Sequence, residues 1–136
     1  GIKEKINASP RLNGNNRKEI IAQLDMAFHQ LLKITGTNNR DSFAYTFVAF
    51  EFVIPLLCKH LSAVGSNTPK KFEDLINTQL ATSDTKLIYD GKQMILARNA
   101  YMHGNKIALK SNFSFVFHEE GILKILDVLD KVSQLL

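Results

Sequence analysis

The hydrophobic positions of this chain recur mainly every three to four residues, the spacing of one face of an α-helix. From about Asn16 the spacing predicts a first helix, which a turn at Gly36, Asn38 and Asn39 ends. Residues 1–15 are rich in Asn, Ser, Pro and Gly and predict a flexible leader or linker. The apolar face of the first helix consists of Ile20, Ile21, Leu24, Ala27, Phe28, Leu31, Leu32 and Ile34.

The next segment, from about Asp41 to Val64, is apolar almost all round. Asp41 is a suitable N-cap and Gly65 a suitable stop, and such a helix is usually surrounded by others. Its aromatic and β-branched residues would also suit a strand, and Pro55 should kink a helix. Its length favours a helix.

Three further segments complete the pattern. A short helix begins at Thr68-Pro69, a longer one runs from a cap at Ser83 or Asp84 to about His103, and a last one covers about 122–135. Between them, Phe113 to Phe117 is a short aromatic run that could be extended, and that either packs on the bundle or stacks bases. The prediction is an all-α bundle over residues 16–136.

Length, charge and cysteine content add few constraints. The chain has 136 residues, close to the usual size of one domain, and its net charge of +4 permits contact with RNA without indicating it. Cys58 is the single cysteine, and the N-terminus lacks an apolar signal segment, which together predict a cytoplasmic protein. The apolar run from Ser42 to Cys58 is short for a bilayer span and contains Glu51, so we expect no membrane contact.

Arg98 is a charged residue on the apolar side of its predicted helix. At about 100° per residue it projects near the centre of an apolar stripe, so it needs an anion, a partner chain or a water-filled cleft. It could also extend off the edge of the stripe or form a salt bridge within the fold. Gly91, on the same stripe, would allow close helix approach or is a tolerated weak spot. The stripe consists of Leu87, Ile88, Gly91, Met94, Ile95 and Met102.

His103 falls in the last turn of the same helix, just before Gly104. The negative end of the helix dipole favours a protonated imidazole there, and Asn99 has the spacing to hold the ring. An imidazole that moves protons beside a guanidinium that stabilises a phosphate is a minimal set for phosphodiester cleavage without a metal. No metal-ligand spacing or Gly-rich phosphate loop is present, so we predict neither a metal nor a cofactor.

The run Arg98-Asn99-Ala100-Tyr101-Met102-His103 resembles the Arg-Asn-x-x-x-His signature of the HEPN superfamily (higher eukaryotes and prokaryotes nucleotide-binding domains). The resemblance covers residues 16–136 in architecture and is specific only at 98–104. It implies a four- to five-helix bundle that forms a homodimer. It also implies a metal-independent endoribonuclease of the toxin, defence or RNA-processing type, leaving 2′,3′-cyclic phosphate and 5′-hydroxyl ends.

By the same resemblance, His103 would be the general acid/base, Arg98 the phosphate ligand, and Asn99 would orient the His103 ring or hold the helix end. Tyr101 and Lys106 would add RNA contacts, although Tyr101 could simply pack in the core.

Glu51 lies inside the most apolar segment. It would either pair with Arg98 or tune His103 as part of the site, or belong to a narrow polar strip with Ser62 and the edge of Cys58.

Two other functions fit the same residues. The chain could be a non-catalytic HEPN-type module of a larger protein that binds a nucleotide, an antitoxin or another partner protein, or that dimerises it. It could also be a helical bundle in which the short motif is a coincidence.

Overall fold

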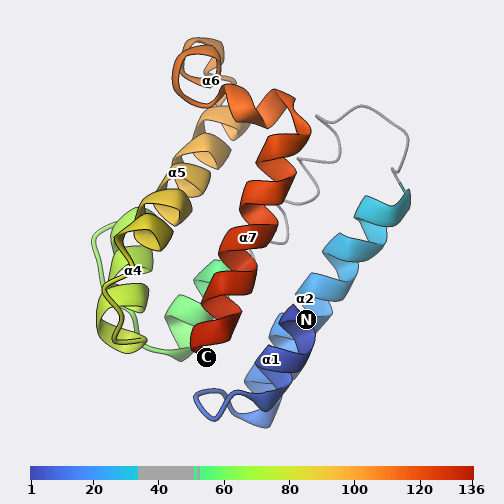
Figure 1. Cartoon of the computed structure of the whole chain (residues 1–136), viewed down its shortest axis with the longest axis vertical. Helices are drawn as coiled ribbons and strands as arrows, with labels where there is room; N and C mark the ends of the chain where they lie inside the picture. The colour runs from blue at the N-terminus through green and yellow to red at the C-terminus, as the bar shows by residue number, and fades with distance from the viewer. Residues whose placement is uncertain (34–50, 52) are drawn as a thin grey trace.

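The computed structural model describes residues 1–33, 51 and 53–136, and in these residues all regular secondary structure is helical (Figure 1). This confirms the all-α prediction. The elements are α1 (Ile2–Ala8), α2 (Gly14–Lys33), α4 (Thr68–Asp74), the π-helical turn η1 (Leu75–Gln79), α5 (Thr85–Met102), α6 (Lys106–Asn112), the 3₁₀ turn η2 (Ser114–Phe117) and α7 (Glu119–Leu135). Residue 51 and residues 53–60 are also helical.

The predicted helix starts agree with capping side chains. The Oδ1 of Asn67 accepts the Lys70 N–H at 2.9 Å at the start of α4, and the Oδ1 of Asp84 accepts the Leu87 N–H at 3.0 Å at the start of α5. Asp84, rather than Ser83, is therefore the cap. The long C-terminal helix α7 also forms where the apolar spacing predicts it.

The apolar segment predicted over 41–64 is described only from residue 51 onward, without residue 52; the rest of that prediction lies outside the described residues. Its helix ends at residue 60, so the predicted end at Val64 is wrong. The reason is Ser62, whose φ of +58° lets the Ala63 N–H reach back to the Cys58 carbonyl at 2.8 Å.

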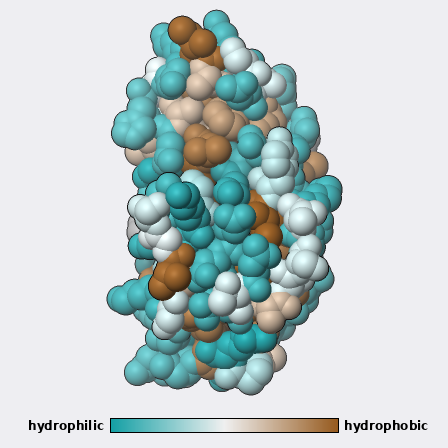
Figure 2. All heavy atoms as spheres, turned by 90° about the vertical axis from the view of Figure 1, so that its left-hand side faces the viewer, coloured by the Kyte–Doolittle hydropathy of each residue, from teal (hydrophilic) through white to brown (hydrophobic). Residues whose placement is uncertain are grey.

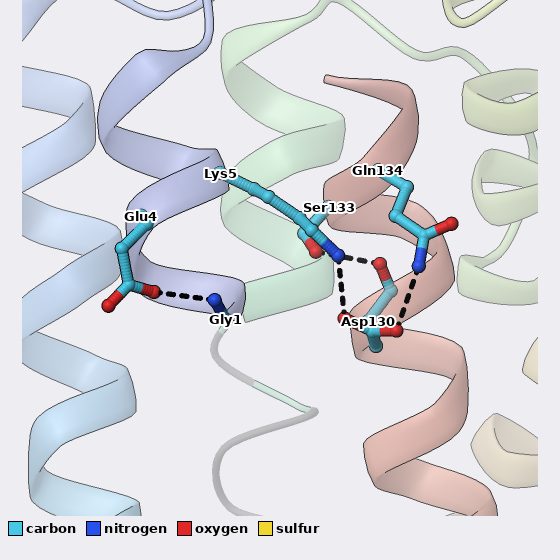
Figure 3. Close-up of polar contacts among 6 residues, drawn as sticks. All are labelled: Gly1, Glu4, Lys5, Asp130, Ser133 and Gln134. Atoms are coloured by element: carbon cyan, nitrogen blue, oxygen red, sulfur yellow. Dashed lines mark hydrogen bonds and ion pairs between the residues drawn. The ribbon is translucent and has the colours of Figure 1, made fainter.

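Residues 1–15, for which the sequence predicts a flexible leader or linker, contain helix α1, which packs on α7 and α2. Helix α1 buries Ile6, and the following turn buries Leu12. Lys5 Nζ contacts Asp130 on α7 at 3.0 Å (Figure 3), and the Ser9 hydroxyl donates to the Leu136 carbonyl at 2.8 Å. Lys5 and Ser9 thus connect the N-terminal segment to the C-terminal part of the chain.

The region between α5 and α7 also differs from the prediction. Asn105 caps a short helix, α6, by accepting the Ala108 N–H at 3.1 Å. Within the predicted aromatic run, Ser114–Phe117 forms the 3₁₀ turn η2 instead of an extended segment, and Phe113 and Val116 are buried in the core. Their role is packing.

The core lies where α4, α5 and α7 meet the helix over 53–60, with α1 packed on α7 (Figure 1). Gly91 on α5 faces the ring of the fully buried Phe72 on α4, which occupies the space that a Cβ at position 91 would take. Gly91 therefore permits close helix approach, the first of its two predicted roles. No helix within the described ranges is both long enough and apolar enough to span a bilayer.

Candidate active site

Helix α5 presents Arg98 beside its buried face. The buried positions of α5 are Leu87, Ile88, Gly91, Met94, Ile95, Ala97 and Ala100. Met102, a predicted member of the apolar stripe, is instead 61% exposed, because α5 ends there and the chain turns away at Gly104. The Arg98 side chain remains 29% exposed, so it sits at the boundary between core and solvent.

The Arg98 guanidinium has two partners. Its Nη2 forms an ion pair with the Oε1 of Glu51, and its Nη1 donates to the Oδ1 of Asn99 at 3.1 Å. The contact with Glu51 agrees with both predictions for Arg98, a carboxylate partner at a site and a salt bridge within the fold. Arg98 Nε is buried and has no hydrogen-bond partner among the described residues. A guanidinium carries five N–H donors, so this one keeps capacity for a further anion.

A small cavity of about 70 Å³ adjoins this cluster. Its walls come from Glu51 and the helix over 53–60, from the start of α4 at Thr68, and from α5. The lining residues are Glu51, Ile54, Pro55, Thr68, Ile95, Arg98 and Asn99. Thr68 and Pro55 have no role in the motif, and their place beside Arg98 depends on tertiary contacts between segments distant in sequence.

His103 ends α5 in a well-defined C-terminal turn. Gly104 has a φ of +64°, the Asn105 N–H bonds to the Ala100 carbonyl at 2.9 Å, and the Gly104 N–H bonds to the Tyr101 carbonyl at 3.2 Å. These paired bonds are the Schellman motif, in which a residue with positive φ closes the helix. The turn leaves His103 exposed at the negative end of the α5 dipole.

The structure does not place His103 in the Arg98 cavity. Five residues of α-helix separate them by about 7.5 Å along the axis and roughly 140° around it. The side-chain oxygen of Asn99 accepts from Arg98, and its backbone carbonyl accepts the His103 N–H at 3.0 Å. The Asn99 side chain thus contacts the guanidinium, whereas its bond to His103 is the ordinary backbone bond of the helix and does not depend on the side chain.

The two further RNA-contact candidates lie on either side of His103. Tyr101 is half-buried and packs against the core, in agreement with its alternative interpretation. Lys106 is exposed at the first position of α6. Within the described part of the chain, no three His, Cys, Asp or Glu side chains are grouped in a way that could hold a metal ion.

Comparisons with protein-family models, curated proteins and solved structures find no match to this chain.

Proposed function

We propose that this chain is a metal-independent endoribonuclease of the HEPN type that acts as a homodimer. The observation that supports it best is the Arg98 cluster: a guanidinium fixed by Glu51 and Asn99 at a cavity, on the helix that presents His103 at its end. Arg98, Asn99 and His103 belong to the stretch of the sequence that resembles a known nuclease motif.

Arg98 would bind the scissile phosphate. Glu51 and Asn99 engage Nη2 and Nη1, so the planar group is already oriented before RNA arrives. The remaining N–H donors of the two terminal nitrogens can bond phosphate oxygens and stabilise the charge that develops on them, because the side chain is 29% exposed.

His103 would carry the proton. An exposed imidazole can accept the proton of the attacking ribose 2′-hydroxyl or give one to the departing 5′-oxygen. The 2′-oxygen then forms its bond to phosphorus while the bond to the 5′-oxygen breaks, which yields a 2′,3′-cyclic phosphate and a 5′-hydroxyl end.

The separation of Arg98 and His103 around α5 favours two chains over one. A phosphate in the Arg98 cavity of one protomer would meet a histidine more readily if a second protomer supplied it. The exposed apolar side chains beside His103 suit such a contact: Met102 is 61% exposed and Ile107 is 79% exposed. Figure 2 views the molecule from the left-hand side of Figure 1. This face is largely hydrophilic, and apolar surface appears at its upper end, where α6 lies.

The test is cleavage of a panel of labelled single-stranded RNAs in excess EDTA. The wild type should cut and leave cyclic-phosphate ends, and His103→Ala should lower the rate by about 10²–10⁴-fold. Arg98→Ala should lower it by about 10²–10³-fold. His118→Ala is the matched control, because His118 is also exposed and caps no helix with its side chain.

DNA of the same sequence lacks the 2′-hydroxyl and should not be cut. Equal cleavage by wild type and both variants, or cleavage that EDTA abolishes, would contradict the proposal. Circular dichroism of Arg98→Ala and Arg98→Lys separates loss of the phosphate ligand from loss of the fold.

A non-catalytic binding module is the second candidate function, and the Arg98–Glu51 ion pair favours it. A carboxylate on the guanidinium already compensates its charge, as a purely structural arginine would require. Absence of cleavage from every RNA, with a stable dimer in solution, would support this candidate over the nuclease.

A further inference from the structure

A second cavity adjoins the Arg98 cavity on the side of the helix over 53–60. Its volume is about 260 Å³, just below the roughly 300–1,000 Å³ of typical small-molecule sites. The two cavities share Pro55 and Thr68 as walls. The second is lined by Pro55, Cys58, Lys59, Ala63, Thr68 and Lys71.

Its charged lining is positive. Lys59 and Lys71 are both exposed, and neither forms an ion pair with a described carboxylate, whereas Lys86 and Lys92 do. Asp74 is an acidic group near this cavity, because its charge raises the pKa of the Cys58 thiol. Its Oδ2 accepts the Val64 N–H at 2.8 Å and the Gln79 amide at 3.3 Å, so two other donors already engage that oxygen.

The rest of the lining is apolar or uncharged. Burial raises the pKa of the Cys58 thiol to about 11, and the nearby Lys71 lowers it only in part. Cys58 is therefore a neutral wall at pH 7 and a poor nucleophile. Pro55 and Ala63 add apolar surface, and Thr68 adds a hydroxyl at the boundary with the first cavity.

We propose that the two cavities form one groove for a single RNA strand, in which Lys59 and Lys71 bind the phosphate that flanks the one held by Arg98. Flexible lysine ammonium groups suit a phosphate whose geometry does not change, and the apolar walls suit the attached ribose or base. This inference rests on the proposed function, because it takes Arg98 as the ligand of the reacting phosphate. It assigns the direction in which the strand leaves that site, toward the helix over 53–60.

The experiment measures binding of a fluorescent 2′-O-methyl RNA oligonucleotide, which cannot be cut because its 2′-oxygen is blocked. The double variant Lys59→Gln/Lys71→Gln should weaken binding by about tenfold at low salt. It should also reduce the slope of log affinity against log salt by about 0.7 for each phosphate that the protein no longer neutralises. Binding of a 2′-O-methyl dinucleotide, which has one phosphodiester for the Arg98 site and none beyond it, should not change.

Lys70→Gln is the matched control. Lys70 is exposed on the same helix as Lys71, and its substitution removes one positive charge, as Lys59→Gln or Lys71→Gln does alone, but Lys70 does not line the cavity. It should affect the oligonucleotide much less than either cavity lysine.

The outcomes separate this inference from the proposed function. If Arg98→Ala weakens oligonucleotide binding and the lysine pair does not, the groove is wrong and the nuclease is unaffected. If no RNA is cut but the double lysine variant still weakens oligonucleotide binding, the groove is supported and the proposed nuclease activity is contradicted. If inorganic phosphate or adenosine monophosphate competes through these lysines as well as the oligonucleotide does, the cavity binds a free phosphate and the strand assignment is overturned.

Discussion

At the scale of single residues, Arg98 is explained by the partners that meet it. A guanidinium beside the apolar face of α5 is costly unless its charge is compensated, and Glu51 compensates the charge while Asn99 accepts one of the five N–H donors. Gly91 is the opposite case, because the neighbouring Phe72 requires that position 91 carry no side chain. The Phe72 ring fills the space that any larger residue would need.

We predict that Gly91→Ala destabilises the protein by about 1–3 kcal/mol, the usual cost of overpacking a core. The added methyl group collides with Phe72, which is fully buried and cannot move aside cheaply. The gain in helix propensity, roughly 1 kcal/mol, offsets only part of this cost. Urea unfolding measures the difference. Gly14→Ala is the control, since a Cβ there meets no atom within 4 Å, and equal effects of the two substitutions would contradict the packing argument.

At the scale of elements, α1 is part of the fold through both apolar and polar contacts. Ile6 is buried, and Lys5 and Ser9 bond to the C-terminal part of the chain (Figure 3). The hydrogen bond from Lys5 holds the pKa of Asp130 below its usual value. Because the folded pKa is lowered, this contribution to stability is present above pH of about 4, the pKa of an unperturbed aspartate, and is lost as the pH falls below it.

We predict that Ile6→Ala lowers the free energy of unfolding by about 2–4 kcal/mol, as expected for truncating a fully buried isoleucine. The unfolding transition should remain single, because α1 packs directly on α7. Lys3→Ala, which removes an exposed ion pair with Asp25, should cost no more than about 1 kcal/mol. If Ile6→Ala has the same small effect, α1 behaves as a detachable leader after all.

At the scale of the whole molecule, Arg98 and His103 must be brought together if they are to act on one phosphate. They sit on different faces of α5, and apolar side chains next to His103 remain exposed. The proposed homodimer would cover those side chains and bring the histidine of one protomer toward the arginine cavity of the other.

We predict that the wild type sediments as a dimer at micromolar concentration and that Met102→Glu/Ile107→Glu sediments as a monomer without RNA cleavage. Both side chains are exposed, so the charges should not disturb the folded chain. Met26→Glu, at an equally exposed position on α2, should leave the mass and the cleavage unchanged. A wild type that is strictly monomeric while it cuts RNA would rule out the composite site.

Several local features follow from the sequence because short-range physics decides them. The spacing of apolar residues predicts α2, α5 and α7, and the cap at Asp84 and the turn at Gly104 fix both ends of α5. The signal for α6 is also present in Asn105, a good N-cap before Ile107 and Leu109, but the segment is too short for its periodicity to stand out. Helix α1 was not predicted, because the turn-forming residues of 1–15 do not indicate whether a short helix among them packs on the rest of the chain.

Periodicity and the cost of burying charge, which can be assessed from the sequence alone, predict that the chain is helical and that Arg98 needs an anion, a partner chain or a water-filled cleft. The packing of the helices selects Glu51 as the partner of Arg98 and turns the Asn99 side chain toward Arg98 and not toward the His103 ring. It also brings Thr68 to the first cavity and Lys71 to the second. These contacts join segments far apart in the chain. Their geometry depends on how whole helices pack, which no local pattern of residues specifies.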